Sequence, residues 1–167
     1  MPTAVSISVE ECLATTYDPD CDYVDGELVE RNMGEFDHGR LQTRMVCYLF
    51  IRESAWGITA ATEVRVQVKP RRFRVPDITV VAGPVPDIRI GREPPLLCIE
   101  ILSPEDRMER MQEKIEDSLA FGVRCIWVVN PRNRRGFIYT SDGMHEAKDG
   151  ILRVEGTPIE VPLADLG

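Results

Sequence analysis

Long apolar runs are missing from this sequence of 167 residues, and none approaches the roughly 18 residues of a membrane-spanning helix. The first residues, M-P-T-A-V-S, also lack the basic and then apolar segments of a signal peptide. The 5 cysteines are scattered, and none forms the C-x-x-C pair typical of zinc sites. We therefore expect a cytoplasmic protein with reduced thiols, without a membrane span, a zinc site or a disulfide framework.

The sequence also lacks an excess of positive charge: it has 28 acidic and 20 basic residues, and its net charge is −8. This balance argues against a nonspecific polycationic nucleic-acid binder. It leaves a nuclease possible, because the carboxylates that bind metal ions are themselves acidic. Two local basic clusters, at residues 69–74 and 132–135, are either solvated turns or DNA contacts. The composition, 43% hydrophobic and 29% charged, predicts one globular domain over residues 1–167.

The first third of the chain predicts a helix, a hairpin and a second helix. Ser8 and Glu11 form a capping box, which predicts a short helix to about residue 16. Asp25-Gly26 lies between two short strand-like segments, the usual sequence of a tight hairpin turn. Asp37 is a suitable N-cap for a helix over residues 38–55, which Gly57 would end.

The middle of the chain predicts an antiparallel pair of strands. Residues 62–69 alternate between valines and polar side chains, which predicts one half-exposed strand. A turn at residues 70–72 would lead into the next strand over residues 73–82. A loop containing several prolines and glycines follows and ends at residue 95.

The second half predicts a β-α-β unit and then hairpins. Residues 96–102 and 123–129 are apolar enough for two buried parallel strands. Between them, Ser103-Pro-Glu-Asp106 predicts a helix start, and Gly122 ends the helix. Its expected buried stripe is Met108, Met111, Ile115 and Leu119. With a C-terminal β-hairpin region over residues 137–163, the fold class is α/β (α+β), a mixed β-sheet flanked by helices.

Two carboxylates stand in apolar surroundings. Asp77 precedes the apolar run 78–82, and Glu100 lies inside the buried strand 96–102. An ionised carboxylate buried in this way costs several kcal/mol, roughly, unless a charge or metal ion compensates it. Such placements are frequent at functional sites. Each also has an ordinary explanation: Asp77 as a residue at a strand start, and Glu100 as half of a structural ion pair with an arginine.

The two carboxylates suit a hydrolytic metal site. Asp77 and Glu100 on adjacent strands would converge on one Mg²⁺ or Mn²⁺ ion, with the backbone carbonyl of Ile101 as a third ligand. A divalent ion activates water and stabilises the charged transition state of phosphodiester hydrolysis. Lys114, at the edge of the helix's buried stripe, can reach back to assist the water or the transition state. A lysine that merely covers the sheet edge is the alternative.

The order of the sequence motifs along the chain resembles that of the Uma-two family of restriction-endonuclease-like proteins, within the PD-(D/E)xK nuclease superfamily. The matching segments lie between about residue 8 and residue 166: Asp25-Gly-Glu-Leu-Val29, His38, Arg74-Val-Pro-Asp-Ile78, Ile99-Glu-Ile-Leu-Ser-Pro104, Lys114, Gly122-Val123, Ile126-Trp-Val-Val129 and Val161-Pro-Leu163. The resemblance implies a restriction-endonuclease-like core and a Mg²⁺-dependent DNase, with DNA as substrate and a homodimer as the working form.

The chain departs from the superfamily pattern at several positions. Leu102 stands where the superfamily has its lysine, and the resemblance implies that Lys114 on the following helix replaces it. Ser118 and Asn130 stand where the family usually has an aromatic residue and an aspartate. These departures leave a second reading open, a catalytically inactive module of the same fold that binds nucleic acid or dimerises.

Further candidates lie upstream of the core. The superfamily sometimes extends its metal site with an upstream carboxylate, for which Glu30 is the first candidate, Glu63 the second, and Glu27 a third. His38, near a helix N-terminus, would be kept neutral there and is a candidate to bind phosphate or water. A capping or packing histidine is the alternative.

Overall fold

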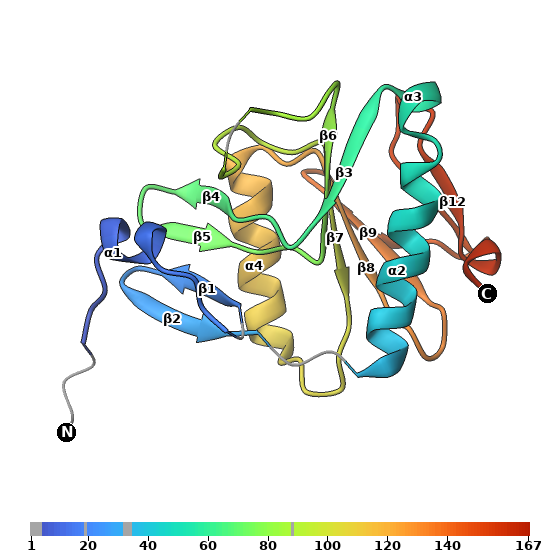
Figure 1. The fold of residues 1–167 in the computed structure, drawn as a ribbon. Helices are drawn as coiled ribbons and strands as arrows, with labels where there is room; N and C mark the ends of the chain where they lie inside the picture. Colours follow the sequence, from blue (N-terminus) through green and yellow to red (C-terminus); the bar gives the residue numbers. More distant parts are fainter. Residues whose placement is uncertain (1–4, 19, 32–34, 88) are drawn as a thin grey trace.

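The computed structural model describes residues 5–18, 20–31, 35–87 and 89–167 (Figure 1). Its largest sheet has six strands, in the order β10 (Gly143–Glu146), β9 (Gly136–Thr140), β8 (Cys125–Val129), β7 (Leu97–Ile101), β6 (Ile78–Ala82) and β3 (Ile58–Thr62). Strands β7 and β8 are parallel, and the other neighbours are antiparallel. The predicted mixed sheet and its β-α-β unit are therefore confirmed.

A second sheet has four antiparallel strands, in the order β2 (Glu27–Glu30), β1 (Cys21–Val24), β5 (Arg72–Arg74) and β4 (Val66–Lys69). The predicted hairpin joins β1 and β2, and its turn residues Asp25 and Gly26 have φ of 51° and 98°. The predicted first helix is α1 (Val9–Ala14), whose N-cap Ser8 accepts a hydrogen bond from the Glu11 amide. The C-terminal hairpin pairs β11 (Ile151–Arg153) with β12 (Glu160–Pro162).

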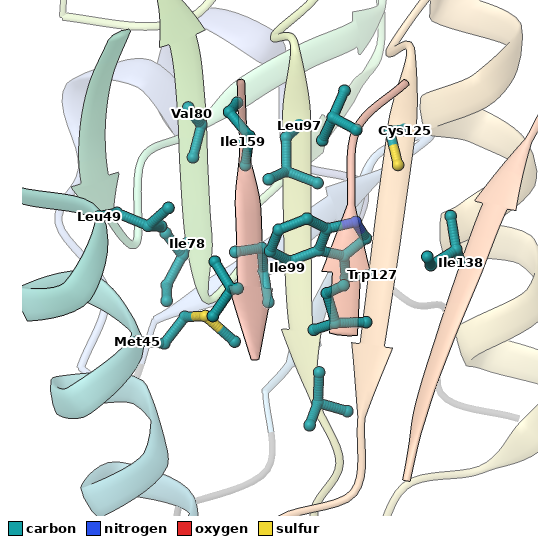
Figure 2. Close-up of a cluster of buried hydrophobic side chains, with 14 of the residues drawn as sticks. Met45, Leu49, Ile78, Val80, Leu97, Ile99, Cys125, Trp127, Ile138 and Ile159 are labelled. Carbon is teal, nitrogen blue, oxygen red and sulfur yellow. The ribbon is translucent and has the colours of Figure 1, made fainter. Parts of the chain in front are cut away.

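Helices cover both faces of the six-stranded sheet (Figure 1). Helix α2 (Phe36–Phe50) contributes Met45 and Leu49 to the larger core, where they lie near Ile78, and Ile99 and Trp127 lie side by side at its centre (Figure 2). Helix α4 (Met108–Phe121) packs Ile115 against the opposite face, where alternate residues of β7 and β8 point. Within the described residues, no helix is both long and apolar enough to cross a membrane.

The structure breaks both strands predicted over residues 62–82. The first is divided into β3 and β4 at Glu63, which adopts a left-handed φ of 55°. The second is divided into β5 and β6 at residues 75–77. At each break the chain leaves one sheet and joins the other. At the first break, the alternation of valines identifies which positions are buried but not which sheet buries them. At the second break, Pro76 has no N–H with which to continue a β-ladder.

Two predicted helix starts are also wrong. Helix α2 begins at Phe36 after the N-cap Glu35, and Asp37 instead accepts a hydrogen bond of 2.8 Å from the His38 amide. The helix ends at Phe50, and the short α3 (Glu53–Trp56) follows before Gly57, which ends it with φ of 64°. The local hydrogen bond of Asp37 to its own turn competes with the capping role.

Helix α4 likewise begins at Met108 rather than after Ser103. The Asp106 carboxylate accepts a hydrogen bond of 2.7 Å from the Ser103 amide, which holds residues 103–107 in a loop. As a result Met108 is 84% exposed and lies outside the buried stripe. The end of the helix at Gly122, with φ of 111°, is as predicted.

Candidate functional site

The candidate site lies where the chain crosses between the two sheets, at residues 75–77. Side chains from three different elements hold this backbone. Asp22 of β1 accepts from the Val75 amide at 3.0 Å, and Lys114 of α4 donates to the Val75 carbonyl at 3.1 Å. Gln42 of α2 donates to the Asp77 carbonyl at 3.0 Å. These bonds satisfy buried polar groups of the backbone at the crossing, where the Asp77 carbonyl also accepts a hydrogen bond of 3.4 Å from the Glu63 amide.

Asp77 and Glu100 come together through strand register. Ile78 pairs with Ile99 in the antiparallel β6–β7 ladder, so the next opposed positions are 77 and 100. Both carboxylates are buried, at 4% and 5% exposure. Asp77 Oδ2 also accepts a hydrogen bond of 2.7 Å from the backbone amide of Ile101. The two carboxylates that the sequence analysis selected therefore share one site.

Three cationic or ionisable side chains contact this pair. Lys114 Nζ lies 3.1 Å from Glu100 Oε1, because α4 covers the face of β7 on which Glu100 lies. Arg31, just after β2, places a guanidinium nitrogen 2.6 Å from Asp77 Oδ1. His38 Nε2, from the first turn of α2, is 3.3 Å from Asp77 Oδ2. Lys114 thus reaches back from its helix to the Glu100 carboxylate, the direction that its helical position predicted.

The surroundings shift the protonation of the carboxylates in opposite directions. Burial raises the pKa of Glu100 to about 7, although the charge of Lys114 opposes this rise. Burial would also raise the pKa of Asp77, but the hydrogen bond from His38 and the charges of Lys114 and Arg31 hold it below its ordinary value. At neutral pH Asp77 is therefore ionised, whereas Glu100 is close to its midpoint.

The carboxylates raise the pKa values of their basic partners Lys114 and His38. Burial alone would lower the pKa of Lys114, but Asp22 and Glu100 raise it above its ordinary value. The hydrogen bond to Asp77 raises the pKa of His38. A position near a helix start predicted a neutral histidine, and the contact with Asp77 reverses this expected direction of the pKa shift because it stabilises the imidazolium form.

A pocket of about 400 Å³ opens onto these residues. Asp77, Glu100, Lys114 and His38 line it, and so does Glu30, the favoured upstream acid. Glu27 also lines the pocket, whereas Glu63 lies outside its lining and approaches Arg31 at 3.8 Å. A ligand can therefore reach the buried carboxylates from solvent.

The donor set suits a hard divalent ion that keeps most of its water. In the described part of the chain, no group of three or more His, Cys, Asp or Glu side chains is placed to hold a metal. Mg²⁺, however, is commonly bound by one or two carboxylates together with water and substrate oxygens. Asp77, Glu100 and the Ile101 carbonyl supply such oxygens, and a cation beside Glu100 would offset the burial that raises its pKa.

The basic clusters noted in the sequence serve mainly internal contacts. Arg74 is buried and its guanidinium lies 2.7 Å from the buried Asp117 of α4, which Arg72 also contacts at 2.9 Å. Arg132 pairs with Glu35 at 2.9 Å, and Arg135 with Glu146 at 2.7 Å. Their charges are therefore largely neutralised by neighbouring carboxylates.

Sequence reasoning missed Arg31, Asp22 and Asp117. Asp22 and Asp117 are both buried, and Asp22 lies inside a strand, which is the same pattern that pointed to Glu100. Asp117 lies one turn beyond Lys114 on α4, where a polar residue in a helix attracts no notice. Arg31 follows a strand end and has no distinguishing pattern around it.

Comparison with known proteins agrees with this architecture. Residues 9–164 match the Uma2 family, described as "Putative restriction endonuclease". No curated protein matches the chain. A crystal structure of a putative nuclease belonging to DUF820 from Anabaena variabilis ATCC 29413 superposes with a TM-score of 0.82 at 22% identity, covering 96% of this chain and 97% of that chain. The two share a fold, so the restriction-endonuclease-like fold is confirmed, and the extent of the sequence match shows that this chain belongs to the Uma2 family.

Proposed function

We propose that the protein is a Mg²⁺-dependent DNA endonuclease that hydrolyses phosphodiester bonds in the pocket beside Asp77 and Glu100. The observation that supports it most is the pair of buried carboxylates on adjacent strands, with Lys114 Nζ 3.1 Å from Glu100, all lining one open pocket. The family description supports a nuclease-like activity. Metal dependence and the roles of individual residues belong to the proposal.

Each residue has a defined task in this proposal. Asp77, Glu100 and the Ile101 carbonyl hold the ion, which when bound supplies a nucleophilic water and neutralises developing charge. Lys114 keeps its proton and stabilises the charge that develops on the phosphate, or orients the water. His38 and Arg31 fix the orientation of Asp77 through their contacts with its two oxygens. Glu30, which is exposed and lines the pocket, is the upstream acid that extends the site in this proposal.

One observation favours a second candidate, an inactive module of the same fold that binds nucleic acid or dimerises. Arg31, His38 and Lys114 already contact the two carboxylates with opposite charge, as in a structural ion-pair cluster. In that case Glu100→Ala would remove a structural partner and destabilise the protein by roughly 3–5 kcal/mol. The homodimer remains a prediction in both cases, and sedimentation analysis tests it.

Metal binding and cleavage separate the two candidates. We expect Mg²⁺ or Mn²⁺ to raise the melting temperature of the wild type but not of Glu100→Ala or Asp77→Asn. Supercoiled plasmid should be nicked by the wild type and by neither of these two variants. Asp142→Asn, in an exposed hairpin turn, is the matched control and should behave like the wild type. A melting temperature that no metal changes, with intact plasmid throughout, would favour the inactive module.

A further inference from the structure

Two exposed arginines, Arg107 and Arg110, line the pocket near the start of α4. Within the described residues, neither side chain makes an ion pair or a hydrogen bond. The other basic side chains of the lining, including Arg31 and Lys114, are each bound to a carboxylate. The free positive charge of this pocket therefore comes from the start of α4.

The two arginines precede the lysine of the site at the start of α4. Arg110 lies one turn before Lys114 on the same helix face, and Arg107 is the N-cap residue, with extended backbone. At 1.5 Å per residue, the N-cap position is about 10 Å and Arg110 about 6 Å from Lys114 along the helix axis. A nucleic-acid strand advances about 3.4 Å per nucleotide along a duplex, so this track spans roughly three nucleotides.

Carboxylates also line this pocket. Glu27 and Glu30 of β2 are exposed in its lining, and so are Glu105, just before α4, and Glu113 on α4. These carboxylates repel a phosphate backbone, so a strand that enters is favoured where Arg107 and Arg110 supply positive charge. Met108, between the two arginines in sequence, is 84% exposed and offers apolar contact to a sugar or base.

We propose that Arg107 and Arg110 bind the phosphate groups next to the scissile phosphate on one nucleic-acid strand, which lies along the first turns of α4. The proposal rests on the nuclease function proposed above and names the surface that holds its substrate. Arginine suits this task because its planar guanidinium binds phosphate oxygens in a bidentate manner. The contacts are to the backbone, so they add affinity without sequence preference.

The test measures binding without cleavage. Fluorescence anisotropy of labelled single-stranded and duplex DNA is titrated in EDTA and again with Ca²⁺, over a range of salt concentrations. The double variant Arg107→Ala/Arg110→Ala is compared with the matched control Arg89→Ala/Arg92→Ala, which changes the same charge in the loop between β6 and β7. Arg89 and Arg92 are exposed and do not line the pocket.

We expect the double variant to bind DNA about tenfold more weakly or worse at 0.1 M salt. The slope of log affinity against log salt concentration should fall by roughly one to two, the loss expected for one to two phosphate contacts. The control should bind like the wild type. Arg107→Lys/Arg110→Lys should recover the salt dependence, which a folding defect would not allow. If the wild type binds DNA and the double variant binds equally well, the contact proposed here is wrong while the nuclease proposal stands. If the wild type binds no DNA, both fail.

Discussion

Replacing Glu100 by glutamine should remove a pH dependence from the stability of the metal-free protein. Burial raises the pKa of Glu100 from an ordinary value near 4.5 to about 7. Between these values the folded state keeps a proton that the unfolded chain has released, so the free energy of unfolding falls as pH rises. At about 1.4 kcal/mol for each pH unit, the total loss is roughly 3 kcal/mol, complete above pH 7.

Glutamine cannot ionise, but its amide oxygen still accepts a hydrogen bond from Lys114 Nζ. We therefore expect Glu100→Gln to match the wild type near pH 4.5 and to be about 3 kcal/mol more stable at pH 8. For a domain of this size that is roughly 6–12 °C in melting temperature. The assay is thermal and urea unfolding in EDTA at several pH values. His38 titrates in both the wild type and Glu100→Gln, so the difference between their free energies of unfolding reports the ionisation of Glu100. Glu109→Gln, an exposed change on α4, is the control.

Parallel pH profiles for wild type and Glu100→Gln would refute this reasoning. They would mean that Glu100 is ionised throughout, held by Lys114 as a structural ion pair, and that burial does not dominate its pKa. The same samples with Mg²⁺ extend the test. A bound divalent ion stabilises the ionised carboxylate, so it should flatten the wild-type profile and leave that of Glu100→Gln unchanged.

Three further predictions concern the same region. Asp117→Asn should cost roughly 3 kcal/mol in urea unfolding, because it removes the carboxylate that lies 2.7 Å from the buried Arg74 and leaves Asp22, at 3.2 Å, as its remaining buried partner. Glu113→Gln, with a side chain 49% exposed, should change stability by less than about 1 kcal/mol. Lys114→Met should abolish plasmid nicking yet keep Mg²⁺ stabilisation; loss of both would assign Lys114 to metal binding instead. Asp77→Asn should lose the Mg²⁺-induced rise in melting temperature, and a retained rise would remove Asp77 from the site.

The sequence was informative where one local pattern had one structural solution. The Asp25-Gly26 turn forms the predicted hairpin, and Gly122 ends α4 with the expected left-handed backbone. Glu100 could be identified because a charge inside an apolar run is conspicuous in any fold. The pairing of Asp77 with Glu100 followed from placing both on adjacent strands, and the β6–β7 register places them opposite each other.

The sequence was uninformative where the outcome depended on distant parts of the chain. Nothing near Glu63 or Pro76 indicates that the backbone changes sheets there, because that depends on which strands are free to accept it. Arg31 has no local pattern, yet its contact with Asp77 joins residues that are far apart in sequence. The predicted start of α4 was too early because the Asp106 carboxylate accepts a hydrogen bond from the Ser103 amide, which stabilises a loop at residues 103–107 instead of a helix cap.

The lysine of this site comes from a helix rather than from the strand, and the geometry explains why that is possible. Side chains alternate along β7, so positions 98, 100 and 102 share the face that α4 covers. A lysine at position 102 would approach Glu100 along the strand, whereas Lys114 approaches from the helix above that same face and reaches 3.1 Å. Leu102 then packs beside Ile115 and Met111 in the α4 core. Moving the charge to the helix therefore keeps an ammonium at the carboxylate while the strand position contributes apolar packing. On this reasoning, Leu102→Lys combined with Lys114→Met should restore part of the nicking lost in Lys114→Met alone, and a double variant that folds but stays inactive would show that the approach from α4 itself is required.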